Sequence, residues 1–255
     1  MRWEERTINM KDKLITAMVQ CRTPDECVER INLSVDAGAE ALGIQLCKLE
    51  HHLRTEDDLR KIFSACGDRE IYVTSYRGGL NKGFTDDECV DLLLKAGKCG
   101  GTLLDVMGDV YCPSQYELAT DKDAVSKQIA LIDKIHSMGC KVLMSSHTNS
   151  VLSAEKTLEI ALCQQERGAD IIKIVNQTQS MSDLCECIRT IQLLKETLDK
   201  PFLYLVGGPC QDFIRQTGVN LGVCMYLTTY MHGELDTKAQ PITKNIRAIR
   251  DNMLF

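Results

Sequence analysis

Short apolar runs alternate with longer amphipathic runs along the whole of this 255-residue chain. The apolar runs have the length of buried strands and span residues 14–20, 41–47, 71–76, 102–106, 141–146, 170–175, 201–206 and 222–227. The amphipathic runs have helical periodicity and span residues 23–37, 56–66, 85–96, 121–137, 153–167, 180–197, 211–216 and 242–253. This alternation predicts parallel strands joined by right-handed crossovers, either in a closed barrel or in an open doubly wound sheet.

The turn after the first expected strand helps to decide between these two folds. An open nucleotide-binding sheet carries G-x-G-x-x-G at that turn, whereas this chain continues with VQCRTPDE. Eight strand–helix pairs match the repeat of an eight-stranded barrel, and no linker interrupts them. We therefore predict an α/β fold, an eight-stranded (β/α)8 TIM barrel, as a single domain over residues 1–255.

Composition and charge exclude several classes of protein. The net charge is −6 and the basic residues form no clustered stripe, so we expect no nucleic-acid partner. No apolar run is long enough to span a bilayer, and the N-terminus MRWEERTINMKDK lacks the apolar core of a signal peptide. The thirteen cysteines are odd in number and form no C-x-x-C, which indicates reduced, core-packing cysteines rather than a metal site. We expect a cytoplasmic protein with no membrane partner, no metal and no cofactor.

The sixth expected strand, in GADIIKIVNQ, carries a lysine among its apolar residues. Ile171, Lys173 and Val175 share one face of that strand, and the two intervening isoleucines share the other. If the isoleucines pack on the helices, Lys173 points into the barrel. Burial there would disfavour the charged form and leave a free amine that can attack a carbonyl and form an imine. The alternatives are a lysine that reaches solvent or that pairs with a carboxylate.

Polar side chains gather at the carboxyl ends of the strands, where barrel enzymes build their active sites. Strand three ends in VTSYRGG with Arg77, and strand five ends in MSSHTNS with His147, next to the strand of Lys173. An imine makes the adjacent carbon acidic, and a nearby imidazole can then remove a proton and pass it on. The pair Lys173 and His147 therefore indicates Schiff-base chemistry. His51, His52 and His232 lie in polar loops and are weaker candidates for contact with a ligand.

Four segments, YVTSYRGG, KVLMSSHTNS, GADIIKIVNQTQSMSDLCECI and the closing AQPI, resemble the type I 3-dehydroquinate dehydratase family. The resemblance implies an eight-stranded barrel enzyme of the shikimate pathway and of aromatic amino acid biosynthesis. It implies that Lys173 forms the imine and that His147 is the general acid and base. It also implies that Arg215 and Gln240 hold the substrate carboxylate and that Arg77 contacts substrate hydroxyls.

The chain departs from the family pattern at several positions. Gln45 and Cys47 stand where the family has a glutamate and an arginine that hold ring hydroxyls. Asn81 stands where a glutamate orients the histidine, so we expect His147 to lack that partner. Asp236 replaces a serine of the final loop, and we expect its charge to lie near Arg215 and to weaken carboxylate binding. Because lost partners of buried polar groups cost discrimination, a site rebuilt at these hydroxyl contacts allows preference for a ketone other than 3-dehydroquinate.

The function that we predict is dehydration of a hydroxylated cyclic keto acid by a Schiff-base hydro-lyase. The expected partner is a small carboxylated ketone, and a homodimer is an option that the sequence leaves open. One alternative is a class I aldolase-like enzyme, because the glycines of LVGGP after strand seven are typical of phosphate-binding turns. A second alternative is a relative that binds a pathway intermediate without catalysis.

Overall fold

The protein is described by a computed structural model, which covers residues 14–252. Within this range the strands are β1 (Leu14–Val19), β2 (Ala41–Gln45), β3 (Ile71–Thr74), β4 (Leu103–Met107), β5 (Lys141–His147), β6 (Ile171–Gln177), β7 (Phe202–Gly207) and β8 (Met225–Thr228). The α-helices are α1 (Pro24–Asp36), α2 (Glu56–Ser64), α3 (Asp86–Cys99), α4 (Lys122–Ser137), α5 (Ala154–Glu166), α6 (Leu184–Thr197), α7 (Gln211–Leu221) and α8 (Thr243–Asn252). The N-terminal stretch MRWEERTINMKDK and residue 253 of the last expected helix lie outside the described range.

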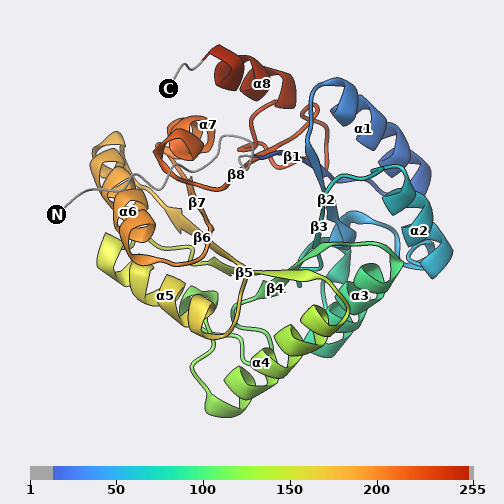
Figure 1. Ribbon diagram of the computed structural model, residues 1–255, viewed down its shortest axis with the longest axis horizontal. Helices are drawn as coiled ribbons and strands as arrows, with labels where there is room; N and C mark the ends of the chain where they lie inside the picture. The colour runs from blue at the N-terminus through green and yellow to red at the C-terminus, as the bar shows by residue number, and fades with distance from the viewer. Residues whose placement is uncertain (1–13, 253–255) are drawn as a thin grey trace.

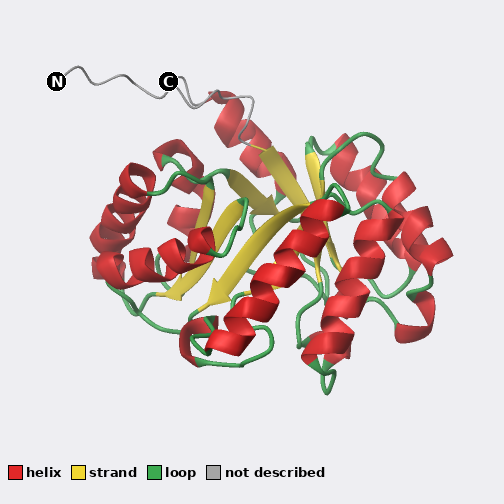
Figure 2. Ribbon diagram, turned by 60° about the horizontal axis from the view of Figure 1, so that its bottom comes forward, coloured by secondary structure: helices red, strands yellow, loops and turns green. Residues whose placement is uncertain are grey.

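The eight strands form one parallel sheet in the order β7-β6-β5-β4-β3-β2-β1-β8. Pairing of β1 with β8 brings the first and the last strand together, and no ladder within residues 14–252 joins β7 to β8. The helices surround the strands in chain order (Figure 1), and they cover the outer face of the sheet (Figure 2). The structure is a nearly closed (β/α)8 barrel, and the predicted fold class is confirmed.

Threonine caps fix the starts of the first three helices. Thr23, Thr55 and Thr85 each accept a hydrogen bond from the backbone three residues on, and a carboxylate at that position bonds back to the cap. These reciprocal bonds satisfy amide groups that have no partner within a helix, so each chain turn from strand to helix is locally specified. No helix within the described range is long and apolar enough to cross a membrane.

Two helices differ most from their expected bounds. The helix expected over 211–216 continues to Leu221 as α7 and stops where Gly222 adopts a φ of 133°, a conformation that glycine accepts readily. The helix expected over 180–197 begins instead as the short 3-10 helix η6 (Met181–Asp183), and α6 follows from Leu184. Ser180 accepts a hydrogen bond from the Ser182 amide, which tightens this first turn.

The two faces of β6 point to different environments. Ile172 and Ile174 are buried in the core, and the Asn176 amide donates to Thr157 on α5 at 2.8 Å. Residues of this set therefore face the helix layer. Lys173 lies on the opposite face, inside the barrel, as the period-two pattern predicts.

Candidate active site

Lys173 is the centre of a polar cluster inside the barrel. Its side chain is 5% exposed, and Nζ lies 3.2 Å from Asp105 Oδ2, 3.0 Å from the Tyr72 hydroxyl and 2.6 Å from the Tyr76 hydroxyl. Asp105 lies on β4 and Tyr72 on β3, so these contacts cross the barrel interior. Register places Ser145 of β5 beside Lys173, and its hydroxyl donates to Asp105 Oδ1 at 2.6 Å.

The cluster stabilises a carboxylate in a dry environment. Burial by itself would raise the pKa of Asp105, but the Lys173 ammonium and the hydroxyls of Ser145, Tyr72 and Tyr76 hold that pKa below its usual value. Burial and the Asp105 charge raise the pKa of both tyrosines well above their usual value, so both hydroxyls stay protonated and can donate. Both donate to Asp105.

The Asp105 contact changes the expected chemistry of Lys173. From the sequence we expected burial to favour a free amine, and the alternative was a lysine paired with a carboxylate. The structure contains that pair, with Asp105 Oδ2 3.2 Å from Nζ. Attack on a ketone requires an unprotonated amine, and Asp105 lies where it can accept the proton that Nζ has to lose.

We predict that Asp105→Asn destabilises the fold at neutral pH. The change leaves the Lys173 ammonium buried without its counter-charge, and breaking a buried pair in this way costs about 3–5 kcal/mol. The pKa of native Asp105 is below that of the unfolded chain, so its contribution is fully present above the unfolded pKa, about 3.9. That contribution is lost as pH falls further, through the lowered native pKa. Urea unfolding should therefore separate the two proteins at pH 7 and less so in acid.

A double substitution is the control for this prediction. Lys173→Met together with Asp105→Asn removes both charges, so we expect the double variant to be more stable than Asp105→Asn alone. Equal stability of the double and single variants would contradict the buried pair.

His147 stands at the end of β5 between a carboxylate and an aromatic ring. Its Nδ1 lies 3.2 Å from both carboxylate oxygens of Glu117, in the 3-10 helix η5 (Gln115–Glu117). The Tyr76 ring meets the imidazole edge-on, with ring centroids 5.2 Å apart. Because the Tyr76 hydroxyl also contacts Lys173 Nζ, one side chain touches both predicted catalytic residues.

Asn81 is not the partner of His147. It is fully buried, accepts from Arg54 Nη1 at 2.7 Å and donates to the Tyr76 carbonyl at 2.9 Å. The expectation that His147 lacks an orienting carboxylate is wrong, because Glu117 approaches from a different loop. Asn81 instead ties the end of β3 to Arg54.

Arg77 is occupied by carboxylates of the protein. Its guanidinium bonds to Asp86 at 2.6 and 2.9 Å and to Asp109 at 2.7 Å. These ion pairs join the end of β3 to the start of α3 and to the loop after β4. A substrate hydroxyl would have to share Arg77 with both acids.

Gln45 and Cys47 contact each other where β2 ends. The Gln45 amide donates to Cys47 Sγ at 3.4 Å, and Cys47 is buried. Two neutral groups thus stand where the family pattern places a carboxylate and a guanidinium.

Arg215 and Gln240 line one cavity of about 260 Å³, together with His232 and Lys238. Burial lowers the pKa of Arg215 to about 10, so the guanidinium is still cationic at neutral pH. Its buried Nε has no hydrogen-bond partner within the described residues. Gln240 accepts from Gln20 at the end of β1 at 3.1 Å. Arg215 thus brings a cationic side chain to the lining of this cavity, and Asp212 lines the same cavity.

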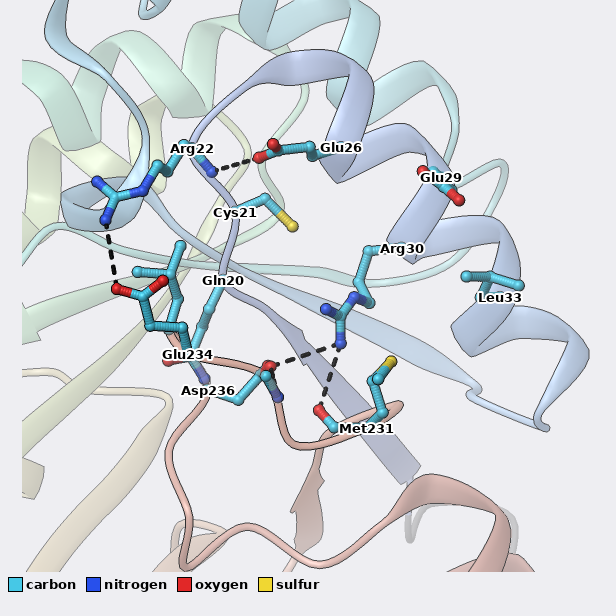
Figure 3. A pocket seen from close by; sticks show the side chains of 12 residues that line it. Gln20, Cys21, Arg22, Glu26, Glu29, Arg30, Leu33, Met231, Glu234 and Asp236 are labelled. Carbon is cyan, nitrogen blue, oxygen red and sulfur yellow. Dashed lines mark hydrogen bonds and ion pairs between the residues drawn. The ribbon is translucent and has the colours of Figure 1, made fainter.

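Asp236 does not lie against Arg215, and the expected weakening of carboxylate binding by this contact is wrong. Its carboxylate accepts from Thr229 at 2.9 Å and from the Gly233 amide at 2.7 Å, and lies 3.5 Å from Arg30 on α1. Figure 3 shows Arg30 reaching from α1 to this loop. Arg30 and Asp236 line a pocket that shares no lining residue with the Arg215 cavity. Asp236 thus fastens the final loop to α1.

Sequence reasoning missed five members of the Lys173 and His147 surroundings: Tyr72, Tyr76, Asp105, Ser145 and Glu117. Asp105 carried a usable signal, since a carboxylate in the apolar run LLDVM resembles the lysine in IIKIV. Glu117 carried none, because it lies in an irregular loop.

The glycine pair of LVGGP has a structural explanation. A Cβ at Gly207 would come within 2.4 Å of the Gln177 side chain, and one at Gly208 within 2.2 Å of the Thr178 carbonyl oxygen. Gly208 also has a φ of 83°. Close packing of β7 on β6 therefore accounts for both glycines, and the aldolase-like alternative loses its supporting feature.

The fold and these contacts define a class of protein: a (β/α)8 barrel with a buried lysine and a histidine–carboxylate pair at the carboxyl ends of its strands. The sequence model of the family described as Type I 3-dehydroquinase matches residues 19–251. The chain therefore belongs to the type I 3-dehydroquinase family, whose members are hydro-lyases.

Individual relatives agree with this assignment. A 3-dehydroquinate dehydratase of Klebsiella pneumoniae (strain 342) is 25% identical over 96% of this chain and 95% of its own length. One from Syntrophotalea carbinolica is 30% identical over 54% of this chain and 45% of its own length.

Solved structures show the same fold at lower identity. The 3-dehydroquinate dehydratase of Geobacillus kaustophilus superimposes with a TM-score of 0.78 and 13% identity, over 94% of this chain and 90% of that chain. A type I 3-dehydroquinate dehydratase of Clostridium difficile, solved with covalently modified comenic acid, gives 0.77 and 15%, over 94% and 92%.

Proposed function

We propose that this protein is a Schiff-base-forming hydro-lyase that dehydrates 3-dehydroquinate to 3-dehydroshikimate, or a closely related hydroxylated cyclic keto acid. The observation that carries the proposal is the buried Lys173 nitrogen, held among hydroxyls and a carboxylate beside the ring that touches His147. A lysine inside a barrel is the group that can bond covalently to a ketone. Family membership favours this reaction over the aldolase-like and non-catalytic alternatives.

Formation of the imine requires transfer of a proton from Lys173. The Asp105 carboxylate accepts a hydrogen bond from Nζ and is placed to take that proton. The free amine then adds to the substrate ketone to give a carbinolamine. Asp105 returns the proton to the carbinolamine hydroxyl, which leaves as water, so that a protonated imine forms and Asp105 is again a carboxylate. Asp105 lies where it would balance the charge of that cation, and the protonated hydroxyls of Tyr72 and Tyr76 would donate to the departing oxygen.

Elimination is assigned to His147. The protonated imine withdraws electrons, so the carbon next to it becomes acidic, and the imidazole removes its proton. The electrons of the broken carbon–hydrogen bond form the new carbon–carbon double bond as the β-hydroxyl leaves. The imidazolium returns the proton to that hydroxyl. The hydroxyl departs as water. A second water then hydrolyses the imine and frees Lys173, so that one molecule of water is lost from the substrate overall.

The Arg215 cavity is proposed to hold the substrate carboxylate. Support comes from the cationic side chains of Arg215 and Lys238 and from the amide of Gln240 in the lining, which also contains one acid, Asp212. Gln45, Cys47 and Arg77 are proposed to face the ring hydroxyls. The final loop, fastened to α1 through Asp236 and Arg30, would shield the imine from water.

Borohydride trapping tests the proposal directly. The protein is incubated with 3-dehydroquinate and borohydride, which reduces an imine to a stable amine, and the modified residue is located by mass spectrometry. We expect one adduct, on Lys173, and ultraviolet detection of the conjugated enone product without borohydride. A panel of cyclic and acyclic keto acids ranks the substrates. Absence of both adduct and product with every compound would refute the function.

Two further features of the protein stay predictions. We propose a cytoplasmic setting, because the thirteen cysteines are all free and most are buried, as in a reducing compartment, and a homodimer as an assembly to be measured by light scattering. Neither bears on the chemistry of the site.

A further inference from the structure

We infer that Glu117 is the positioning residue for His147, in place of the carboxylate that the family supplies from the loop after strand three. This inference rests on the proposed function for its catalytic meaning. The family position is occupied by Asn81, whose side chain is fully used by Arg54, Ser75 and the Tyr76 carbonyl. An amide in these contacts cannot serve the imidazole.

Glu117 contacts His147 at the ring and at the backbone. Both carboxylate oxygens lie 3.2 Å from Nδ1, and Oε2 also accepts from the His147 backbone amide at 3.2 Å. A carboxylate can only accept, so the ring proton lies on Nδ1 and the lone pair of the neutral ring lies on Nε2. Nε2 is thereby the atom that can take a proton from substrate. The Tyr76 ring, edge-on to the imidazole, limits its rotation.

The loop that carries Glu117 adopts an unfavourable backbone. Tyr116 and Glu117 have φ values of 64° and 50°, a left-handed region that residues other than glycine avoid. Two consecutive residues in this region persist only where surrounding contacts impose it. Such a conformation directs the Glu117 side chain to β5.

Several hydrogen bonds hold the loop in this conformation. Ser146, next to His147 on β5, donates to the Glu117 carbonyl at 2.8 Å, and the buried Arg167 donates to the Ala119 carbonyl at 2.5 Å. Gly108 lets the loop approach, because a Cβ there would lie 2.4 Å from the Glu117 carbonyl oxygen. These contacts involve the backbone of the loop. Exchange of the Glu117 side chain leaves them in place.

The test compares Glu117→Gln and Glu117→Ala with a matched control, Asp170→Asn. Asp170 pairs with His136 at 2.8 Å, before the start of β6, and takes no part in the proposed chemistry. We expect Glu117→Ala to lower kcat about 100-fold with little change in KM, because proton transfer by the imidazole is impaired while substrate contacts remain. The kcat of Glu117→Gln should lie between that of Glu117→Ala and that of the parent. The kcat of Asp170→Asn should match that of the parent. Borohydride adducts on Lys173 should persist in all of them.

A second measurement does not depend on turnover. Nitrogen chemical shifts of ¹⁵N-histidine report the tautomer of each ring, and the His147 signal is assigned with His147→Asn. We expect the Nδ1–H form in the parent and in Asp170→Asn, and a mixture of tautomers in Glu117→Ala. An unchanged His147 tautomer in Glu117→Ala overturns the inference, even if activity falls. A parent protein that shows this tautomer shift on substitution but never turns over a keto acid refutes the proposed function and upholds the positioning role.

Discussion

Lys173→Met is expected to abolish both borohydride trapping and dehydration, with kcat/KM lower by a factor on the order of 10⁴ or more. Methionine matches the length of much of the lysine side chain but has no nitrogen to form an imine. The measurement is the mass of the intact protein after reduction with 3-dehydroquinate, together with the rate of enone formation. An adduct that still forms in this variant would remove Lys173 from the mechanism.

The control for Lys173 is a second lysine of the barrel sheet, which lies at the amino end of its strand. Lys141 begins β5 and pairs with Glu70 at 3.3 Å, so Lys141→Met also removes a lysine–carboxylate pair from the barrel. We expect trapping and turnover to match the parent. Because Lys173→Met leaves the buried Asp105 carboxylate without its counter-charge, the fold of this variant is checked by circular dichroism. The double variant with Asp105→Asn restores charge balance and should still fail to trap substrate.

His147→Asn should separate the two halves of the reaction. Imine formation needs the Lys173 nitrogen, whereas elimination needs the imidazole, so we expect dehydration to fall about 10²- to 10⁴-fold while the covalent adduct still forms. An adduct with the mass of the undehydrated substrate should accumulate on Lys173. Rapid quenching followed by mass spectrometry distinguishes it from the adduct of the product.

His136→Asn is the matched control for His147. His136 also pairs with a carboxylate, Asp170, but at the amino end of β6 rather than at the carboxyl end of β5. Its substitution should leave both trapping and turnover unchanged. A His147→Asn protein as active as this control would show that another group moves the proton.

The departures from the family pattern have different meanings once their contacts are known. Asp236 is a loop anchor to Arg30, and Asn81 is a partner of Arg54, so neither acts on the group that the pattern suggested. Gln45 and Cys47 contact each other and carry no charge. At β2 the chain lacks the charged side chains that contact substrate hydroxyls in the family pattern. This departure therefore bears most directly on substrate choice, and the panel of keto acids tests it.

Local pattern was sufficient for the barrel and for the inward direction of Lys173. The alternation of apolar and amphipathic runs is repeated eight times, and period two along 170–175 separates the isoleucines that pack on helices from the lysine that does not. Both are properties of neighbouring residues. Local pattern did not identify Arg215 and Gln240, which were assigned only through a family resemblance. The structure shows that they line one cavity.

Partners distant in sequence were decided by the tertiary structure alone. Asp105 is 68 residues from Lys173, and Glu117 is 30 residues from His147. Strand order and register bring the first pair together, and a left-handed loop brings the second. The charge balance around Lys173 and the tautomer favoured at His147 depend on these neighbours, because electrostatic and hydrogen-bond energies are set by distances of a few ångströms in space. Periodicity along the chain determined which way the lysine points, and only the folding of the sheet into a barrel determined which side chains it contacts there.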